Sequence, residues 1–241
     1  MPGHHASDFP DPAHPRHTAL WHRVAGELPR GELAHDAAHI QRVYRWALHL
    51  AEEAGVDEDL AGAAALIHDL VFIPKNHPDR PLGGERAAAA APPHLRQAGY
   101  NADEIAQLVE AVRTCSWSRA LAPTAQLGRL LQDADRLDAL GLIGLARTIA
   151  CHQHFATAAT PGAFYHPTDP TGADPQRQLD DTRYAFDHLR VKLLRLAAHM
   201  HLPSARAEAD RRHAWLLAAL AELEREFATG STGAQPAVRR R

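Results

Sequence analysis

The sequence is poor in cysteine: among 241 residues it contains only Cys115 and Cys151. A single pair in a chain of this length does not make a disulfide framework, so we expect free or buried thiols and a cytoplasmic location. No apolar run reaches the roughly 20 residues that a membrane span needs. The N-terminus also lacks the basic and then apolar layout of a signal peptide. We therefore expect no membrane partner.

The chain has no strong excess of charge of either sign. Its formal net charge is -3, from 26 basic and 29 acidic residues. A charge this small gives no global field that would attract a nucleic acid polymer. An anionic ligand must therefore be bound by local groups.

Alternating β-branched residues dominate no stretch, so a sheet is not expected. Apolar residues recur instead at the spacing of amphipathic helices. This spacing is found in residues 40–48, 105–112, 127–137, 189–197 and 215–223. We predict an all-α fold in a single domain.

Proline and glycine mark the expected ends and joints of this domain. Residues 1–16 and 229–241 are predicted to be disordered tails, which leaves a domain at 17–228. The pair Pro92-Pro93 predicts one of the breaks between helices. The segment 157–175 exceeds ordinary connection length, and two interpretations stay open for it: a lid over a site, or a floppy insertion.

Four residues with metal-ligand chemistry fall in three separate helical segments: His39, the pair His68-Asp69, and Asp135. The pair follows the apolar run 60–67, where a charge without compensation is costly to bury. Two imidazoles and two carboxylates suit Mn, Fe, Co, Ni or Zn, whereas Mg prefers oxygen ligands. We expect one divalent metal at these residues, with Mg also considered.

These residues resemble a known pattern. A first His, an adjacent His-Asp and a distant Asp hold the metal in the HD-domain superfamily of metal-dependent phosphohydrolases. The most specific part of the resemblance is the stretch 133–141, Asp-Ala-Asp-Arg-Leu-Asp-Ala-Leu-Gly, which is similar to one bacterial branch, the YpgQ/YedJ-like proteins. The resemblance implies a helical bundle with His39, His68, Asp69 and Asp135 as metal ligands at its centre.

The same resemblance implies a substrate class. Activity in that branch includes nucleoside triphosphate pyrophosphohydrolysis, so we expect a small phosphorylated molecule, a nucleotide, as substrate. A bound metal would activate water for attack on phosphorus. The expected assembly is a monomer or a homodimer.

The sequence offers two candidate carboxylates as the source of the catalytic proton. Some HD enzymes place a Glu three residues after the Asp of the His-Asp pair, but Phe72 stands there in this chain. Proton transfer is therefore assigned to Glu85 or Asp138, while Asp69 takes part in catalysis as a metal ligand.

A polyanionic substrate needs cationic partners. We predict phosphate contacts for four basic residues, each of which also fits a helix-face salt bridge: Lys75, Arg136, Lys192 and Arg212. Trp117 fits core packing, and it also fits stacking against a base.

Three alternative hypotheses for the function stay open. His35 and His39 have the spacing of a zincin pair, although Asp36 is better interpreted as a helix N-cap. An HD oxygenase with two irons would need further ligands, for which His77 and His94 are available. A non-catalytic sensor would bind a nucleotide through the same metal pocket without turnover.

Overall fold

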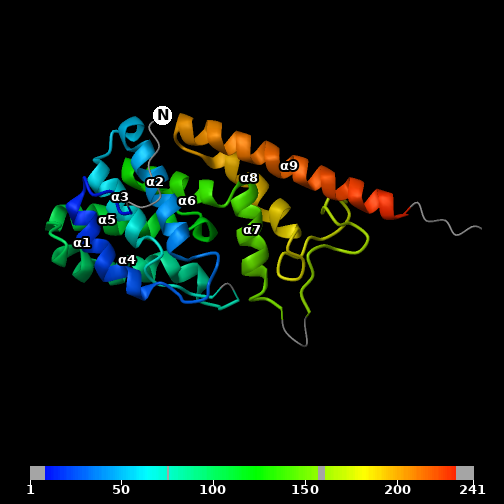
Figure 1. Cartoon of the computed structure of the whole chain (residues 1–241), viewed down its shortest axis with the longest axis horizontal. Coiled ribbons are helices and arrows are strands. Elements are labelled where there is room, and N and C mark those ends of the chain that lie inside the picture. Colours follow the sequence, from blue (N-terminus) through cyan, green and yellow to red (C-terminus); the bar gives the residue numbers. More distant parts are fainter. Residues whose placement is uncertain (1–8, 75, 157–160, 232–241) are drawn as a thin grey trace, which may run out of the picture.

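The chain folds into helices joined by turns and loops (Figure 1). The computed structural model describes residues 9–74, 76–156 and 161–231. Within these ranges there is no strand, only two isolated β-bridges, and no helix is long and apolar enough to cross a membrane. The α-helices are α1 (Pro15–Val24), α2 (Ala37–Ala54), α3 (Glu58–Ile67), α4 (Gly83–Gln97), α5 (Ala102–Cys115), α6 (Gln126–Asp138), α7 (Gly141–His152), α8 (Leu194–Leu196) and α9 (Pro203–Ser231). The prediction of an all-α fold is confirmed.

Helix α2 has clear signals at both ends. The Asp36 carboxylate accepts a hydrogen bond from the backbone N–H of His39 and so caps the N-terminus. Gly55 ends the helix at φ 62, a left-handed conformation that glycine adopts without a steric penalty. The N-cap prediction for Asp36 is confirmed. Because this carboxylate is engaged with the helix backbone, the zincin reading loses its general base.

Helix α3 lies in the centre of the core and packs against α1, α2, α5 and α6. Every residue from Ala61 to Ile67 is buried, and the many small side chains let neighbouring helices approach closely. Leu and Ile side chains from α2, α5 and α6 surround it, and full burial of each contributes roughly 1.5–3 kcal/mol. The packing brings the start of α2, the end of α3 and the middle of α6 together.

The predicted break at Pro92-Pro93 is wrong, because α4 continues through both prolines to Gln97. The inner face of this helix buries Ala87, Ala88, Ala91 and Leu95. Tertiary packing of that face outweighs the hydrogen bonds that two prolines remove.

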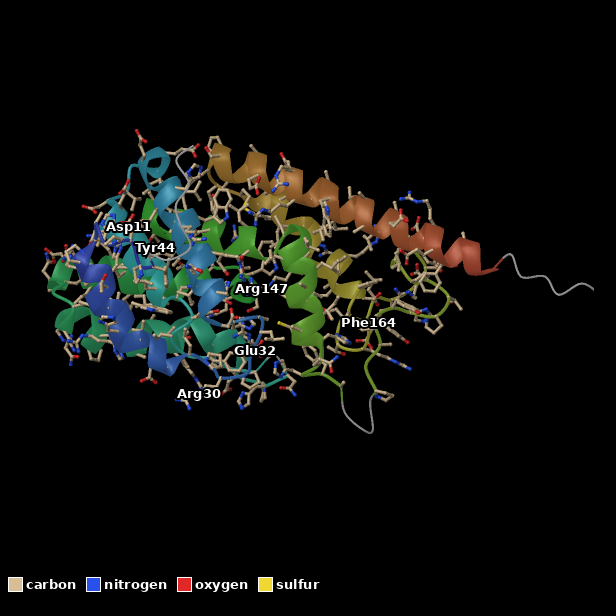
Figure 2. The ribbon with its side chains drawn as sticks, in the orientation of Figure 1. Asp11, Arg30, Glu32, Tyr44, Arg147 and Phe164 are labelled. Carbon is tan, nitrogen blue, oxygen red and sulfur yellow. The ribbon has the colours of Figure 1, made fainter. Side chains whose placement is uncertain are left out.

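The N-terminal boundary also differs from the sequence prediction. Helix α1 starts at Pro15, and Phe9 packs edge-on against Trp21 and Tyr44, with ring centroids 4.8 and 5.3 Å apart. The Asp11 backbone N–H donates to the Tyr44 hydroxyl at 3.2 Å, and both residues are labelled in Figure 2. Part of the predicted tail therefore belongs to the fold, while residues 1–8 lie outside the described residues.

At the C-terminus the last helix is slightly longer than expected. Helix α9 extends to Ser231, past the predicted boundary at 229, and residues 232–241 lie outside the described ranges. In Figure 1, α9 runs along one face of the molecule, on the same side as α7 and α8.

The long connection between α7 and the last helices has its own internal contacts. Residues 157–160 lie outside the described part, but from residue 161 onward the loop is described. Arg177 forms ion pairs with Asp169 and with the fully buried Asp187, both at 2.6 Å. Asp187 also accepts from the Asp180 backbone N–H at 2.8 Å. These contacts do not fit a floppy insertion, and the lid remains a prediction.

Candidate metal centre and pocket

The four predicted ligands meet where α2, α3 and α6 converge. His39 lies in the first turn of α2, His68 is the C-cap of α3 with Asp69 directly after it, and Asp135 lies on α6. Nε2 of His39 is 3.2 Å from Nε2 of His68. From the same His39 atom, Asp69 Oδ2 lies at 3.5 Å and Asp135 Oδ1 at 3.7 Å. The folded chain thus brings all four residues together.

Hydrogen bonds fix which nitrogen each imidazole presents. Nδ1 of His39 donates to the buried Asp138 carboxylate at 2.8 Å, and Nδ1 of His68 donates to the Ala65 carbonyl at 2.8 Å. In the neutral rings both facing Nε2 atoms are then unprotonated acceptors. Two lone pairs at 3.2 Å repel each other unless a cation lies beside them.

The spacing also fits a metal. A divalent ion with bonds of about 2.1 Å holds neighbouring ligand atoms roughly 3.0–3.4 Å apart. The distances from His68 Nε2 to Asp69 Oδ2 and Asp135 Oδ1 are 3.7 and 3.8 Å. A small contraction would bring these atoms to the separation of ligands on one ion. The nitrogen and oxygen donors present therefore fit a transition metal better than Mg.

Electrostatics at the centre favour a positive charge among these residues. Burial and the Arg147 charge act to lower the pKa of His39, but Asp138 and Asp69 outweigh them and raise it. Burial acts to raise the pKa of Asp69, but His68 and the neighbouring imidazoles hold it well below its usual range. The carboxylate is thus kept ionised, as a metal ligand must be.

Asp138 has a supporting place rather than a reactive one. Its side chain is buried and binds His39, Arg42 at 2.6 Å and Arg147 at 2.9 Å. Burial acts to raise the pKa of Asp138, but these partners hold it well below its ordinary value. A carboxyl group that stays ionised and fully engaged orients His39 and does not serve as an acid.

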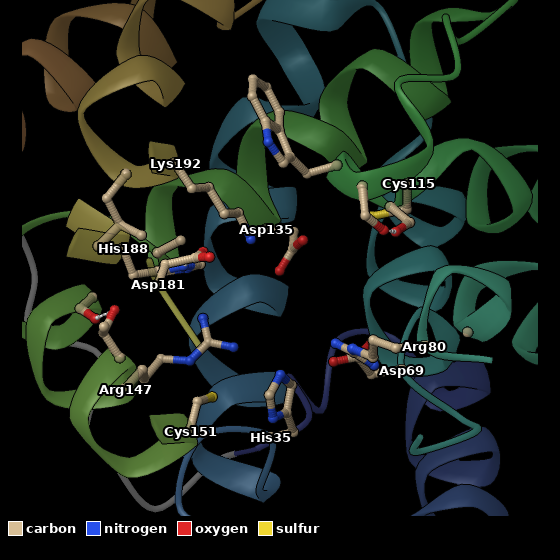
Figure 3. Close-up of a pocket in the computed structure, with 18 of the residues that line it drawn as sticks. His35, Asp69, Arg80, Cys115, Asp135, Arg147, Cys151, Asp181, His188 and Lys192 are labelled. Atoms are coloured by element: carbon tan, nitrogen blue, oxygen red, sulfur yellow. Dashed lines mark hydrogen bonds and ion pairs between the residues drawn. The ribbon is translucent and has the colours of Figure 1, made fainter. Parts of the chain in front are cut away.

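A pocket of about 280 Å³ opens beside the ligands. His68, Asp69 and Asp135 line it, so a molecule in the pocket can reach the metal centre. Figure 3 shows residues from several other parts of the chain around the same space. The lining also includes Arg80, Cys115, Trp117, Arg147, Cys151, Asp181, His188 and Lys192.

Among the predicted phosphate contacts, Lys192 lies in the pocket. Its side chain extends toward Asp135 (Figure 3), and burial lowers its pKa, partly offset by Asp135. Among the described residues Lys192 has neither a hydrogen bond nor an ion pair from its ammonium group. It therefore remains available to an anionic ligand. Lys75 lies outside the described residues.

The other two predicted cations lie elsewhere. Arg136 is buried, donates to the His199 carbonyl and to Gln132, and packs over Trp117. Arg212 donates to the Leu137 carbonyl at 2.7 Å and to Glu208, where it docks α9 on α6. Neither lines the pocket, so both are corrected to structural roles.

Glu85, the other predicted proton carrier, does not line the pocket either. Its side chain is 52% exposed and pairs with Arg119, whereas the pocket wall nearby is formed by Gly83 and Gly84. His77 and His94, considered as ligands for a second iron, do not line the pocket either. In contrast, Asp181 and His188 both line the pocket, and His188 Nδ1 lies 2.7 Å from Asp181 Oδ2.

Sequence reasoning missed this pair and Arg80. A signal for His188 was present in the stretch 187–193, Asp-His-Leu-Arg-Val-Lys-Leu, which carries His188 and Lys192 one helical turn apart. Arg80 gave no signal, because it lies between prolines and enters the pocket from a short 3-10 turn, Arg80–Leu82.

The geometry thus defines a class: an all-α protein in which two His and two Asp that could hold a metal lie beside a pocket lined by both basic and acidic side chains. The HD domain family model matches residues 36–140, a span that starts at the N-cap of α2 and ends after α6. It includes all four ligands. Residues 36–140 of this chain are therefore similar to an HD domain.

Similar proteins cover most of the chain. YpgQ of Bacillus subtilis (strain 168) is 28% identical over 194 residues, which are 80% of this chain and 84% of that protein. The crystal structure of YpgQ in complex with ADP superposes with a TM-score of 0.62 at 26% identity, over 87% of this chain and 96% of that one. A structure from Lactobacillus plantarum has a TM-score of 0.67 at 26% identity, over 88% and 96%.

Proposed function

We propose that the protein is a metal-dependent phosphohydrolase that cleaves a nucleotide or a related phosphate ester or anhydride. The observation that carries the proposal is the pair of imidazole Nε2 atoms, 3.2 Å apart, beside two carboxylates at the bottom of the pocket. A metal bound there would polarise a phosphoryl oxygen and lower the pKa of water from about 16 toward 7. His39, His68, Asp69 and Asp135 would hold it.

The proposed phosphate contacts are Lys192 and Arg80, on opposite sides of Asp135 and Asp69 in Figure 3. Both carry charge into a pocket whose metal ligands are acidic, and a polyanion would need this charge to approach them. Arg147 is a weaker candidate because Asp138 and the Ala34 carbonyl already engage its guanidinium.

The proposed proton carrier is His188, in place of Glu85 and Asp138. Asp181 accepts the Nδ1 proton of His188, so Nε2 is the nitrogen that exchanges a proton with a ligand. A carboxylate behind an imidazole also stabilises the protonated ring. His188 is thus suited to protonate the oxygen that leaves phosphorus.

A nucleotide is the substrate we favour. Trp117 lines the pocket, and its indole offers a flat apolar surface for a base. The relative YpgQ has been crystallised with ADP, which supports the same ligand class here. The pocket volume of about 280 Å³ and its open side leave room for one small molecule rather than a polymer.

The experiment is a panel of nucleoside mono-, di- and triphosphates with protein loaded with Mn, Co or Ni. Phosphate and pyrophosphate are measured separately. We expect release by the wild type and a loss of at least about 100-fold in Asp69→Ala, because a metal ligand is removed. Asp103→Ala on α5 is the matched control, since Asp103 is exposed and lies outside the pocket.

Two results would contradict the proposal. Absence of any phosphate or pyrophosphate release across the panel, with Asp69→Ala indistinguishable from wild type in metal content, would overturn it. Tight nucleotide binding without turnover would favour the non-catalytic sensor instead.

A further inference from the structure

We infer that the pocket wall holds a second divalent-metal site, built by Glu32, His35 and Cys151. One carboxylate oxygen, one imidazole nitrogen and the thiol sulfur of these residues all lie within 4.8 Å of one another. None of the three belongs to the HD ligand set described above. The site therefore lies beyond the proposed phosphohydrolase function and does not depend on it.

The three residues come from two parts of the fold. Glu32 and His35 lie in the loop before α2, and Cys151 lies in the last turn of α7. Glu32 and His35 are only 7% and 4% exposed, and Cys151 is partly buried. His35 Nδ1 is 3.6 Å from Glu32 Oε1, slightly more than the roughly 3.0–3.4 Å that separates two ligands of one ion, so a small contraction brings both within bonding distance.

Neighbouring groups hold the carboxylate in place. Glu32 Oε1 accepts from the Ala34 backbone N–H at 2.9 Å, and Oε2 is paired with His154 Nε2. A buried carboxylate beside two imidazoles and a thiol is an arrangement that a cation stabilises.

The nearest fixed positive charge does not oppose a cation strongly. Arg147 lies one turn before Cys151 on α7, but its guanidinium is paired with Asp138 and donates to the Ala34 carbonyl. Figure 3 shows Cys151 next to His35, on the side of Arg147 away from Lys192. The charge of Arg147 is therefore directed toward the HD centre.

The donor chemistry selects the metal. A thiolate with an imidazole and a carboxylate favours Zn, Co or Ni over Mg or Ca. On binding, the Cys151 thiol loses its proton to solvent and its sulfur bonds to the metal. Because His35 and Cys151 line the pocket, an open coordination position would face the substrate space.

Cobalt gives a direct test, because a Co(II)–thiolate bond has a charge-transfer absorption in the near ultraviolet. The chain has only two cysteines, so such a band must come from Cys151 or Cys115. Imidazole and carboxylate ligands at the HD centre, and the histidines of the N-terminus, give no thiolate band. Metal-free full-length protein is titrated with Co(II), and the band is recorded for wild type and variants.

We expect the band in wild type and in Cys115→Ser, and its absence in Cys151→Ser. Glu32→Gln should need at least about tenfold more cobalt for the same band, because the variant keeps the shape and loses the charge. His35→Asn should likewise need at least about tenfold more cobalt, although its thiol is intact. This variant tests the site if Cys151→Ser fails to fold. Circular dichroism checks the fold of each variant.

The inference is overturned by absence of the band in wild type, by its persistence in Cys151→Ser, or by wild-type cobalt affinity in a folded His35→Asn. The readout is spectroscopic and uses no substrate. Failure of the phosphohydrolase proposal would leave the band unchanged, so the two ideas fail separately.

Discussion

Asp138 binds Nδ1 of His39 at 2.8 Å and so determines that Nε2 of His39 faces His68. The carboxylate comes from α6, 99 residues further along the chain, and is buried with Arg42 and Arg147 around it. A predicted metal ligand is therefore oriented by a residue that does not itself line the pocket. Such supporting carboxylates commonly raise the affinity of a histidine site.

The first prediction concerns this support. Asp138→Asn should weaken metal binding about 10- to 100-fold, because the amide removes the charge that fixes the His39 tautomer. Metal affinity is measured by competition with a chelator. Asp103→Asn, an exposed acid on α5, is the control. Unchanged affinity in a folded Asp138→Asn would show that His39 is oriented by other contacts.

Asp138 also shows how far the sequence alone can go. The four candidate ligands could be proposed from the sequence because a His-Asp pair after an apolar run and a dense acidic helix are both unusual in a core. The role of Asp138 was not found, because residues 39 and 138 become neighbours only through the packing of α2 on α6. Sequence shows which groups are present, but not which of two nearby carboxylates turns toward the pocket.

The pocket cations show the same limit. Lys192, Arg136 and Arg212 all suited a phosphate contact in the sequence, but only Lys192 lines the pocket, whereas Arg136 and Arg212 make structural contacts. A helical Arg can face a pocket or a neighbouring carbonyl, and only the packing of the neighbouring helix decides. The prediction of a helix break at Pro92-Pro93 was wrong for a related reason. The local preference of proline against a helix was outweighed by the packing of the buried face of α4.

The second prediction tests Lys192. Lys192→Met should lower kcat/KM for a polyphosphate substrate about 10- to 100-fold, because one of the two proposed phosphate partners in the pocket is lost. Steady-state kinetics measures the effect. Arg195→Met, an exposed cation one turn away, is the matched control and should stay within about twofold. Equal behaviour of the two variants would remove Lys192 from the phosphate site.

The third prediction tests the proton carrier. His188→Gln should lower kcat by about 100-fold or more, because a positioned acid contributes that much to the transition state. Asp181→Asn should have a smaller effect and should shift the pH profile of kcat. Glu85→Gln should have little effect, since that side chain pairs with Arg119 outside the pocket. A large loss in Glu85→Gln with normal His188→Gln would reverse the assignment.

The fourth prediction concerns the packing of α1 on α3. A Cβ at Gly62 would lie 2.3 Å from the His17 ring, which is held between the Tyr44 hydroxyl and the Asp59 carbonyl. Gly62→Ala should therefore destabilise the protein by about 1–3 kcal/mol, although alanine favours a helix by about 1 kcal/mol. Chemical unfolding measures this. Gly26→Ala, with nothing within 4 Å of the new Cβ, should be near neutral.

The last prediction is a pH dependence at the docking of α9. Arg211 and Arg212 lower the pKa of Glu208 to about 2, against an opposing effect of burial. Because its folded pKa lies below the unfolded value near 4.5, Glu208 stabilises the fold above pH 4.5, and this contribution is lost as pH falls through 2. Its side chain is 18% exposed, so solvent screening reduces the contribution to about 1–2 kcal/mol.

Glu208→Gln should therefore be less stable than wild type at pH 7, and the difference should shrink toward zero as pH approaches 2. Urea unfolding at a series of pH values measures it. Glu222→Gln is the control, because Glu222 forms the same kind of pair with Arg225 but is 55% exposed. Such exposed pairs contribute less than about 1 kcal/mol. A constant difference at all pH values would mean that Glu208 acts through packing rather than charge.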